Sequence, residues 1–117
     1  MLFRSTDDER CEAAYTFCKN IIDYTKHVTV CYKPNIAFFE SLSHRNGINT
    51  LHRVLQLIPN NIPILLDCKR GDIGTTASSY AKACYDTIPS GSSTVVDAVT
   101  LSPFMGYDSI EPFISGK

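Results

Sequence analysis

A chain of 117 residues with a formal net charge of −1 is long enough for one domain with a modest core. Hydrophobic residues make up 44% and charged residues 20% of it, which is typical of a folded protein and excludes a disordered chain or a strongly basic partner of nucleic acids. No apolar stretch approaches the roughly 18 to 20 residues that span a bilayer, and residues 1–5 are too short for a signal sequence. We therefore expect a cytoplasmic protein that binds neither nucleic acid nor membrane.

The cysteines and histidines do not have the spacing of a metal site. The five cysteines include no CxxC pair, and their odd number argues against a disulfide framework. Cys11 and Cys18 lie seven residues apart on a predicted helix, so we expect buried, reduced thiols there. His27, His44 and His52 have no partner at the spacing of a metal site or a catalytic triad. The sequence therefore predicts no metal.

The first half of the chain predicts helix, strand and helix. Thr6 and Glu9 have the spacing of a capping box, and apolar residues follow at helical intervals up to position 22. Residues 28–32 are rich in β-branched and aromatic side chains and predict a strand that stops at Lys33, because Pro34 interrupts a ladder. Apolar residues between positions 48 and 58 return to helical spacing.

The second half repeats the alternation. The Ile- and Leu-rich run 62–66 is typical of a strand covered on both faces, and residues 76–85 have helical spacing. A break at 89–93, a strand at 95–101 and a helix that Asp108 caps complete the chain. The order α-β-α-β-α-β-α indicates an α/β fold with parallel strands and helical crossovers. A small doubly wound sheet and part of a (β/α)₈ barrel both fit this order.

Charged residues gather where two predicted strands end. Lys33 ends the first strand, and Asp67 and Lys69 follow the second on one face, because side chains alternate along a strand. Neighbouring parallel strands lie about 4.8 Å apart, so Lys33 can reach Asp67, and Asp72 follows past a glycine bend. In such an array each lysine keeps its neighbouring carboxylates ionised, and an ammonium can be placed as a proton donor beside a carboxylate. In the alternative interpretation, Asp67 and Lys69 form an ordinary ion pair at the end of a strand and Asp72 caps the following helix. Such an exposed ion pair stabilises a fold by only about 0 to 1 kcal/mol.

Three separated motifs resemble those of orotidine 5′-phosphate decarboxylase. They are the CYKPNxAFFE segment at 31–40, the DxKxxDIGxT segment at 67–76, and the SPFMG and DS segments within 102–109. Related sugar-phosphate decarboxylases and hexulose-phosphate synthases share the short DxKxxD pattern, but we do not expect KPNxAFFE or RGDIGTT in them. The likeness begins at about residue 10 and runs to the end of the chain.

This resemblance implies a TIM (β/α)₈ barrel that decarboxylates orotidine monophosphate to UMP and CO₂ in pyrimidine biosynthesis, without a cofactor. Asp67 would lie against the departing carboxylate, and Lys69 would protonate C6 of the pyrimidine. Lys33 would complete the charge network and contact the ribose. These roles agree with the general finding that preorganised charges stabilise a transition state.

The resemblance also implies partners. Asp72, Ile73 and Thr76 would bind substrate in the active site of a second subunit, so a homodimer with shared active sites is expected. A fusion to orotate phosphoribosyltransferase is one arrangement of the parent protein that the resemblance allows.

The chain departs from the family pattern at both ends. A complete member opens with a strand whose Asp binds the ribose, and its pyrimidine-binding strands and phosphate-binding Arg would lie beyond Lys117. We therefore expect residues 1–117 to form one partial barrel domain, about half of the complete barrel, that is catalytically incomplete alone. The alternatives are a metal-dependent sugar-phosphate decarboxylase or aldolase of the same superfamily, and a non-catalytic α/β binding module.

Overall fold

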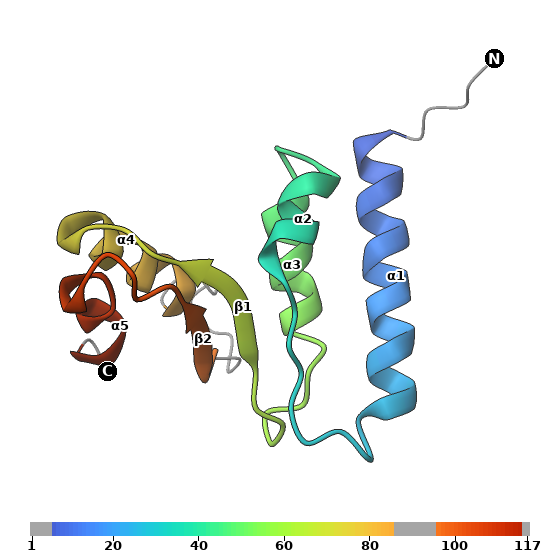
Figure 1. Cartoon of the computed structure of the whole chain (residues 1–117). Coiled ribbons are helices and arrows are strands. Elements are labelled where there is room, and N and C mark those ends of the chain that lie inside the picture. The colour runs from blue at the N-terminus through green and yellow to red at the C-terminus, as the bar shows by residue number, and fades with distance from the viewer. Residues whose placement is uncertain (1–5, 86–95, 116–117) are drawn as a thin grey trace.

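Two parallel strands and the helices around them organise the computed structural model, which describes residues 6–85 and 96–115. In chain order the elements are α1 (Asp7–Thr25), α2 (Ile36–Leu42), α3 (Gly47–Leu55), β1 (Leu65–Arg70), α4 (Gly74–Tyr85), β2 (Ala98–Leu101), the 3₁₀ helix η1 (Tyr107–Ser109) and α5 (Glu111–Ser115). Figure 1 shows α1, α2 and α3 grouped on one side of the strands, and α4 and α5 on the other. Within the described ranges, no helix combines the length and apolar character that crossing a membrane requires.

The predicted capping box at the start of α1 is confirmed. The Thr6 hydroxyl accepts a hydrogen bond from the backbone N–H of Glu9, and the Glu9 carboxylate accepts one from the backbone N–H of Thr6. Both bonds satisfy donors that a helix start otherwise leaves free.

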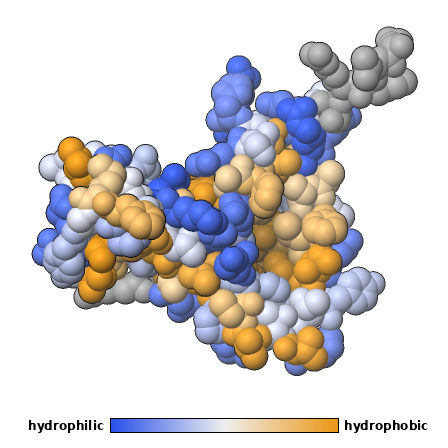
Figure 2. All heavy atoms as spheres, viewed as in Figure 1, coloured by the Kyte–Doolittle hydropathy of each residue, from blue (hydrophilic) through white to orange (hydrophobic). Residues whose placement is uncertain are grey.

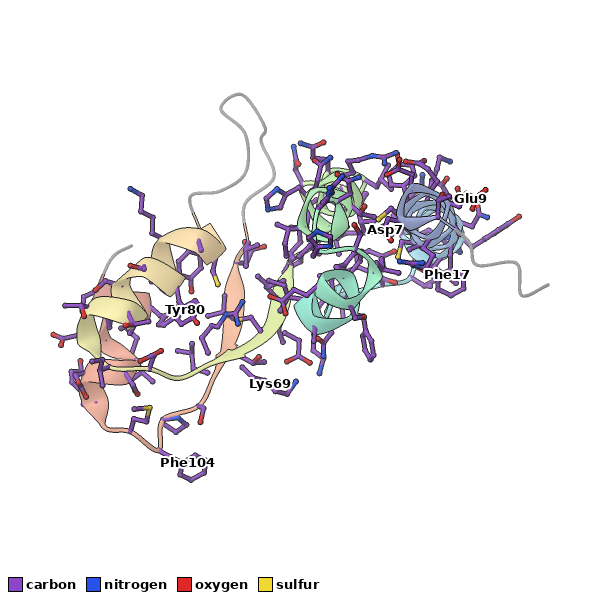
Figure 3. All side chains as sticks on the ribbon, turned by 90° about the horizontal axis from the view of Figure 1, so that it is seen from above. Asp7, Glu9, Phe17, Lys69, Tyr80 and Phe104 are labelled. Atoms are coloured by element: carbon purple, nitrogen blue, oxygen red, sulfur yellow. The ribbon has the colours of Figure 1, made fainter. Side chains whose placement is uncertain are left out.

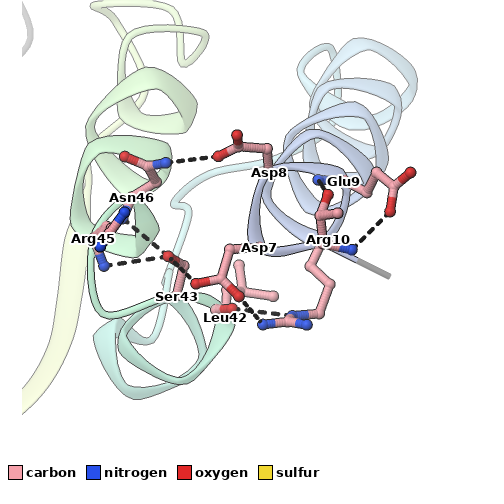
Figure 4. A network of polar contacts seen from close by, with 9 residues as sticks. Asp7, Asp8, Glu9, Arg10, Leu42, Ser43, Arg45 and Asn46 are labelled. Carbon is pink, nitrogen blue, oxygen red and sulfur yellow. Dashed lines mark hydrogen bonds and ion pairs between the residues drawn. The ribbon is translucent and has the colours of Figure 1, made fainter. Parts of the chain in front are cut away.

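Polar contacts join this end of α1 to the turn between α2 and α3 (Figure 4). The Ser43 hydroxyl donates to Asp7 Oδ2 at 3.0 Å, and Asn46 Nδ2 donates to Asp8 Oδ1 at 2.7 Å. Arg10 Nε donates to the carbonyl of Leu42 at 3.1 Å. The acidic side chains in the first turn of α1 therefore interact favourably with the helix dipole and also hold α1 against the turn between α2 and α3.

The strand predicted at residues 28–32 is wrong in position. Val28 and Val30 are 72% and 87% exposed. Pairing begins only at Tyr32, which forms a parallel bridge with Ile64, and a second bridge joins Asn35 to Asp67.

Proline explains why this pairing stays short. The carbonyl of Pro34 accepts a hydrogen bond from the backbone N–H of Asp67 at 2.9 Å, so the chain does pair on either side of the proline ring. Pro34 has no N–H to return, and a hydrogen bond of the ladder is missing there. The first predicted strand is thus reduced to two isolated bridges that still align Lys33 beside β1.

The strand β1 continues beyond the apolar run and includes the charged residues. Leu65 and Leu66 pair in parallel with Ala98 and Val99, and Arg70 pairs with Leu101, so four steps along β1 oppose two along β2. This irregularity lies at the charged segment of β1. The predicted strand at 95–101 is confirmed for Ala98–Leu101, while the predicted break at 89–93 and Val95 lie outside the described residues.

One core cluster joins both sides of the sheet. Its largest contributors come from α3, from the run before and within β1, and from α4. They include Leu51, Val54, Leu55, Ile62, Ile64, Leu66, Ala77, Ala81 and Cys84, and Val96 joins them from the segment before β2. The helix predicted at 76–85 is confirmed as α4, and its small residues allow it to pack closely on β1.

An apolar groove of about 390 Å³ lies between α1 and α2. Phe17, Ile21 and Phe38 line it and are 66%, 46% and 73% exposed, and Figure 2 shows the hydrophobic surface between the two helices. The core of the described residues is therefore only partly covered, as expected of part of a barrel.

The chain end differs from the prediction in one detail. Asp108 was expected to cap a helix, but it lies inside η1, whose N-cap is Gly106. The α-helix begins only at Glu111, with Pro112 in its first turn, where its missing N–H is tolerated.

A close approach of α2 and α3 makes Gly47 irreplaceable. A Cβ at this position would lie 2.0 Å from the carbonyl oxygen of Phe39. We expect Gly47→Ala to lower the free energy of unfolding by about 1–3 kcal/mol, because the backbone of α2 must move to admit the methyl group. Urea unfolding followed by circular dichroism measures this change.

Gly74→Ala is the matched control, since a Cβ there meets nothing within 4 Å. Alanine favours a helix over glycine by at most about 1 kcal/mol, so this variant should be neutral or slightly stabilised. Equal effects of the two substitutions would contradict the packing of α2 on α3.

Candidate functional site

A buried carboxylate at the middle of β1 forms the centre of the site. Asp67 is 5% exposed, although its charge would ordinarily keep it in water. Lys69 Nζ lies 2.5 Å from Asp67 Oδ1, and Lys33 Nζ lies 3.7 Å from Asp67 Oδ2. The predicted meeting of the two lysines at Asp67 is what the structure shows.

Thr100 of β2 anchors this segment of β1. Its hydroxyl donates to Asp67 Oδ1 at 2.8 Å and accepts the backbone N–H groups of Cys68 and Lys69 at 3.1 and 3.0 Å. A side chain here replaces the regular ladder, which accounts for the irregular register of β1 against β2.

Lys69 takes an unusual backbone conformation at this point. Its φ of 46° makes it the one non-glycine residue with positive φ in the described ranges. That conformation is costly for a side chain with a Cβ and concentrates at functional sites. Strand alternation correctly predicted that Lys69 faces Asp67, but it did not predict the positive φ of Lys69.

Asn35 also donates a hydrogen bond to the carboxylate of Asp67. Its Nδ2 donates to Asp67 Oδ2 at 3.1 Å, while its Oδ1 accepts the backbone N–H of Ala37 and caps α2. One amide thus orients the carboxylate and starts the next helix. The sequence analysis missed Asn35 and Thr100 as site residues. The Asn before a helical segment was a signal available for Asn35, and nothing in the sequence singled out Thr100.

These contacts favour the ionised carboxylate. The hydrogen bond from Lys69 lowers the pKa of Asp67 most, followed by that from Thr100, and the charges of Lys69 and Lys33 add to it against the opposing effect of burial. The two lysine side chains remain 58% and 68% exposed. The site therefore presents two accessible ammonium groups around one fixed, buried anion.

The predicted residues at the start of α4 lie apart from this cluster. Asp72 Oδ1 accepts the backbone N–H of its neighbour Ile73 at 2.8 Å, and no ion pair joins it to Lys33 or Lys69 within the described part of the chain. Ile73 is 56% exposed and Thr76 is partly exposed. Three of the four predicted charges thus come together, and the fourth, Asp72, is partly exposed and forms no described ion pair with them.

The open side of the cluster lies away from α4. In Figure 3 Lys69 and Phe104 project away from α4, and Phe104 is 95% exposed. Residues 6–85 and 96–115 contain no group of three His, Cys, Asp or Glu side chains that could hold a metal ion. The arrangement can repel a negative group placed beside Asp67 and donate a proton from Lys69.

The pKa of Asp67 provides a test of this geometry. A folded-state pKa below the ordinary value means that Asp67 stabilises the fold above that ordinary value and loses this contribution as the pH falls through its folded pKa. Carbon-13 NMR titration should show the lowered pKa in the native chain and a higher one in Thr100→Val. The variant should also lose about 1–3 kcal/mol of stability, because two backbone N–H groups lose their acceptor.

Thr75→Val, at an exposed position of α4, serves as the control and should change neither quantity. An unchanged pKa of Asp67 in folded Thr100→Val would contradict the role assigned to the hydroxyl.

Comparison with known proteins identifies the family of this chain. A family model described as orotidine 5′-phosphate decarboxylase / HUMPS family matches residues 7–116. A curated orotidine 5′-phosphate decarboxylase from Herpetosiphon aurantiacus is 47% identical over 98 residues, which cover 84% of this chain and 34% of the relative. One from Leptospira interrogans is 45% identical over 106 residues, or 88% of this chain and 36% of the relative.

Solved structures match the fold as well. The OMP decarboxylase of Leishmania donovani has 39% identity and a TM-score of 0.80, covering 90% of this chain and 39% of that one. The UMP synthase of the same organism has 39% identity and a TM-score of 0.81, covering 90% and 22%.

The chain spans about a third of the length of the curated relatives it matches. Its alternating helices and parallel strands are accordingly part of a TIM barrel. With its fold and nearly all of its length matched, the chain belongs to the orotidine 5′-phosphate decarboxylase / HUMPS family.

Proposed function

We propose that this chain supplies the charge network of an orotidine 5′-phosphate decarboxylase, which converts orotidine monophosphate to UMP and CO₂ in pyrimidine biosynthesis in the cytoplasm. The observation that carries the proposal is the buried Asp67 held between Lys33 and Lys69. The names of the curated relatives support the reaction and the substrate.

The chemistry follows from the fixed charges. The substrate carboxylate lies beside Asp67, and the bond between that carboxylate and C6 breaks to release CO₂. The electron pair stays on C6, where the ammonium of Lys69 stabilises it and then donates a proton to form UMP. Because Asn35 and Thr100 already hold Asp67, and Asp67 holds Lys69, little reorganisation is needed as charge develops.

The residues at the start of α4 are proposed to serve a second subunit. Ile73 exposes more than half of its surface, and the carboxylate of Asp72 accepts a hydrogen bond from the backbone N–H of Ile73. An exposed apolar side chain next to a partly exposed carboxylate suits a dimer interface better than a surface in contact with water. We assign Asp72, Ile73 and Thr76 to the substrate site of the partner in a homodimer.

The parent protein is expected to be longer than this chain. The relatives are about two and a half times as long, because 98 aligned residues make up 34% of one of them. One structural neighbour is a UMP synthase, which supports a fusion to orotate phosphoribosyltransferase as one form of the parent. Binding of substrate groups far from the reacting atoms helps to lower the activation barrier of an enzyme. The isolated chain should therefore be inactive without the contacts that the rest of the parent protein makes. A metal-dependent enzyme acting on sugar phosphates is the alternative within the same family.

A chimera tests the activity. The matching segment of the Herpetosiphon aurantiacus enzyme is replaced by residues of this chain, and the loss of orotidine monophosphate is followed by absorbance. We expect decarboxylation that a chelator does not inhibit, and we expect Lys69→Ala to reduce kcat by at least about 10²–10³-fold because a preorganised charge is lost.

Lys82→Ala, at an exposed position of α4, is the matched control and should retain full activity. Residues 1–117 alone should be inactive. A folded chimera that is inactive, or that needs a metal ion, would rule out the proposed reaction.

Mixing two inactive variants tests the shared site. Chimeras with Lys69→Ala and Asp72→Ala should each be nearly inactive alone, yet regain activity when their subunits are exchanged. One site of a mixed dimer then combines an intact Lys69 from one subunit with an intact Asp72 from the other. If exchange is verified by mass spectrometry and no activity returns, Asp72 does not act across an interface.

A further inference from the structure

Two thiols meet on the face of β1 opposite the charge cluster. Cys68 lies between Asp67 and Lys69 in the sequence, and its Sγ is 3.9 Å from the Sγ of Cys84 on α4. The residues are 8% and 6% exposed. All five cysteines are free thiols, and within the described residues the sulfurs of Cys68 and Cys84 contact each other.

The surroundings make the two sulfurs unlike. The Cys84 thiol donates a hydrogen bond to Cys68, and this bond, together with the positive charge of Arg70, lowers the pKa of Cys68 despite burial. The same contact and burial raise the pKa of Cys84. The Cys68 thiol itself donates to the carbonyl of Thr100 at 3.4 Å, so it reacts only after it loses that proton. A Cys68 thiolate beside the Cys84 thiol is the arrangement of an attacking and a resolving cysteine.

A cavity reaches Cys84, whose sulfur lies 3.9 Å from that of Cys68. It has a volume of about 280 Å³ and lies between α3 and α4, with Cys84 and Arg70 among its lining residues. The Arg70 guanidinium stacks over Tyr80 at 4.6 Å, and its Nη2 lies 3.4 Å from Glu40 Oε1. Its buried Nε has no hydrogen-bond partner in the described part of the chain. A small polar molecule can therefore enter and find both an N–H donor and the sulfur of Cys84.

We propose that Cys68 and Cys84 form a modification site, a dithiol that hydrogen peroxide or a small organic hydroperoxide oxidises reversibly to a disulfide. The Cys68 thiolate attacks one peroxide oxygen, the O–O bond breaks, and hydroxide leaves, which gives a sulfenic acid. The Cys84 sulfur then attacks the Cys68 sulfur, the S–O bond breaks, and the hydroxyl group leaves as water with the Cys84 proton. Two thiols and one hydrogen peroxide thus yield one disulfide and two waters, and a cellular dithiol reductant reverses the change.

The modification reaches the charge cluster through the backbone. A disulfide requires the sulfurs to approach from 3.9 Å to about 2.05 Å, so the two side chains must rotate toward each other and draw β1 and α4 with them. Cys68 belongs to the irregular segment of β1 that Thr100 anchors. Oxidation is therefore expected to displace Asp67 and Lys69 from their paired geometry. The existence of the disulfide does not depend on the proposed decarboxylase activity.

The experiment treats residues 1–117 with hydrogen peroxide under native conditions and maps the thiols by mass spectrometry without reduction. We expect the loss of two hydrogens and a single cross-linked peptide pair that joins Cys68 to Cys84. Dithiothreitol should restore the free thiols. In Cys84→Ala the cross-link should be absent, and dimedone should instead label Cys68 as a sulfenic acid.

Cys11→Ala is the matched control, because it removes another buried thiol and should leave the cross-link unchanged. The same oxidation in guanidinium chloride should give a mixture of pairings among the five cysteines. If the native chain gives that same mixture, or gives no bond between Cys68 and Cys84, the proposal is wrong. Because the mapping uses the unsubstituted chain, this result holds even if Cys84→Ala fails to fold.

Discussion

The burial of one carboxylate constrains much of the described structure. An anion removed from water is unstable unless hydrogen bonds and opposite charges replace its hydration. Asp67 receives three hydrogen bonds, from Asn35, Lys69 and Thr100, which belong to three separate segments of the chain. The position of the segment after α1, of β1 and of β2 is thereby tied to the same two oxygen atoms.

This constraint also explains why β1 and β2 do not pair regularly. The Thr100 hydroxyl, rather than a backbone carbonyl, accepts the N–H groups of Cys68 and Lys69. With the hydroxyl as acceptor, the backbone of Lys69 takes a left-handed conformation. The contacts to Asp67 offset the conformational free energy that this costs. A regular ladder would be locally more stable, but it would not hold the lysine ammonium against the carboxylate.

Sequence reasoning was successful where the information is local. The capping box at Thr6, the helix at 76–85 and the convergence of Lys33 with Lys69 on Asp67 follow from spacing and strand alternation, and the structure confirms them. It was less successful where distant parts of the chain decide the outcome. Val28 and Val30 remain exposed because pairing with the neighbouring segment begins only at the bridges of Tyr32 and Asn35.

The site residues that sequence reasoning missed show the same limit. Thr100 has no local pattern that distinguishes it from other strand threonines, and its role exists only because β2 lies beside an irregular part of β1. The absence of Asp72 from the described ion pairs of Asp67 likewise depends on the bend before α4. In that bend a Cβ on Gly71 would come within 2.8 Å of the Ser102 carbonyl oxygen.

The hydrogen bonds around Asp67 have a consequence for the order in which the chain folds. Asn35 and Thr100 are separated from Asp67 by 32 and 33 residues, on opposite sides along the chain. Two loops of similar length must close before the carboxylate exchanges its hydration for these partners, and the entropy of closing them opposes early assembly. Helices α1 and α4 can form from local contacts well before that. The charge cluster is therefore among the last features to take shape, and an intact Asp67 environment reports that both flanking segments have reached their final positions.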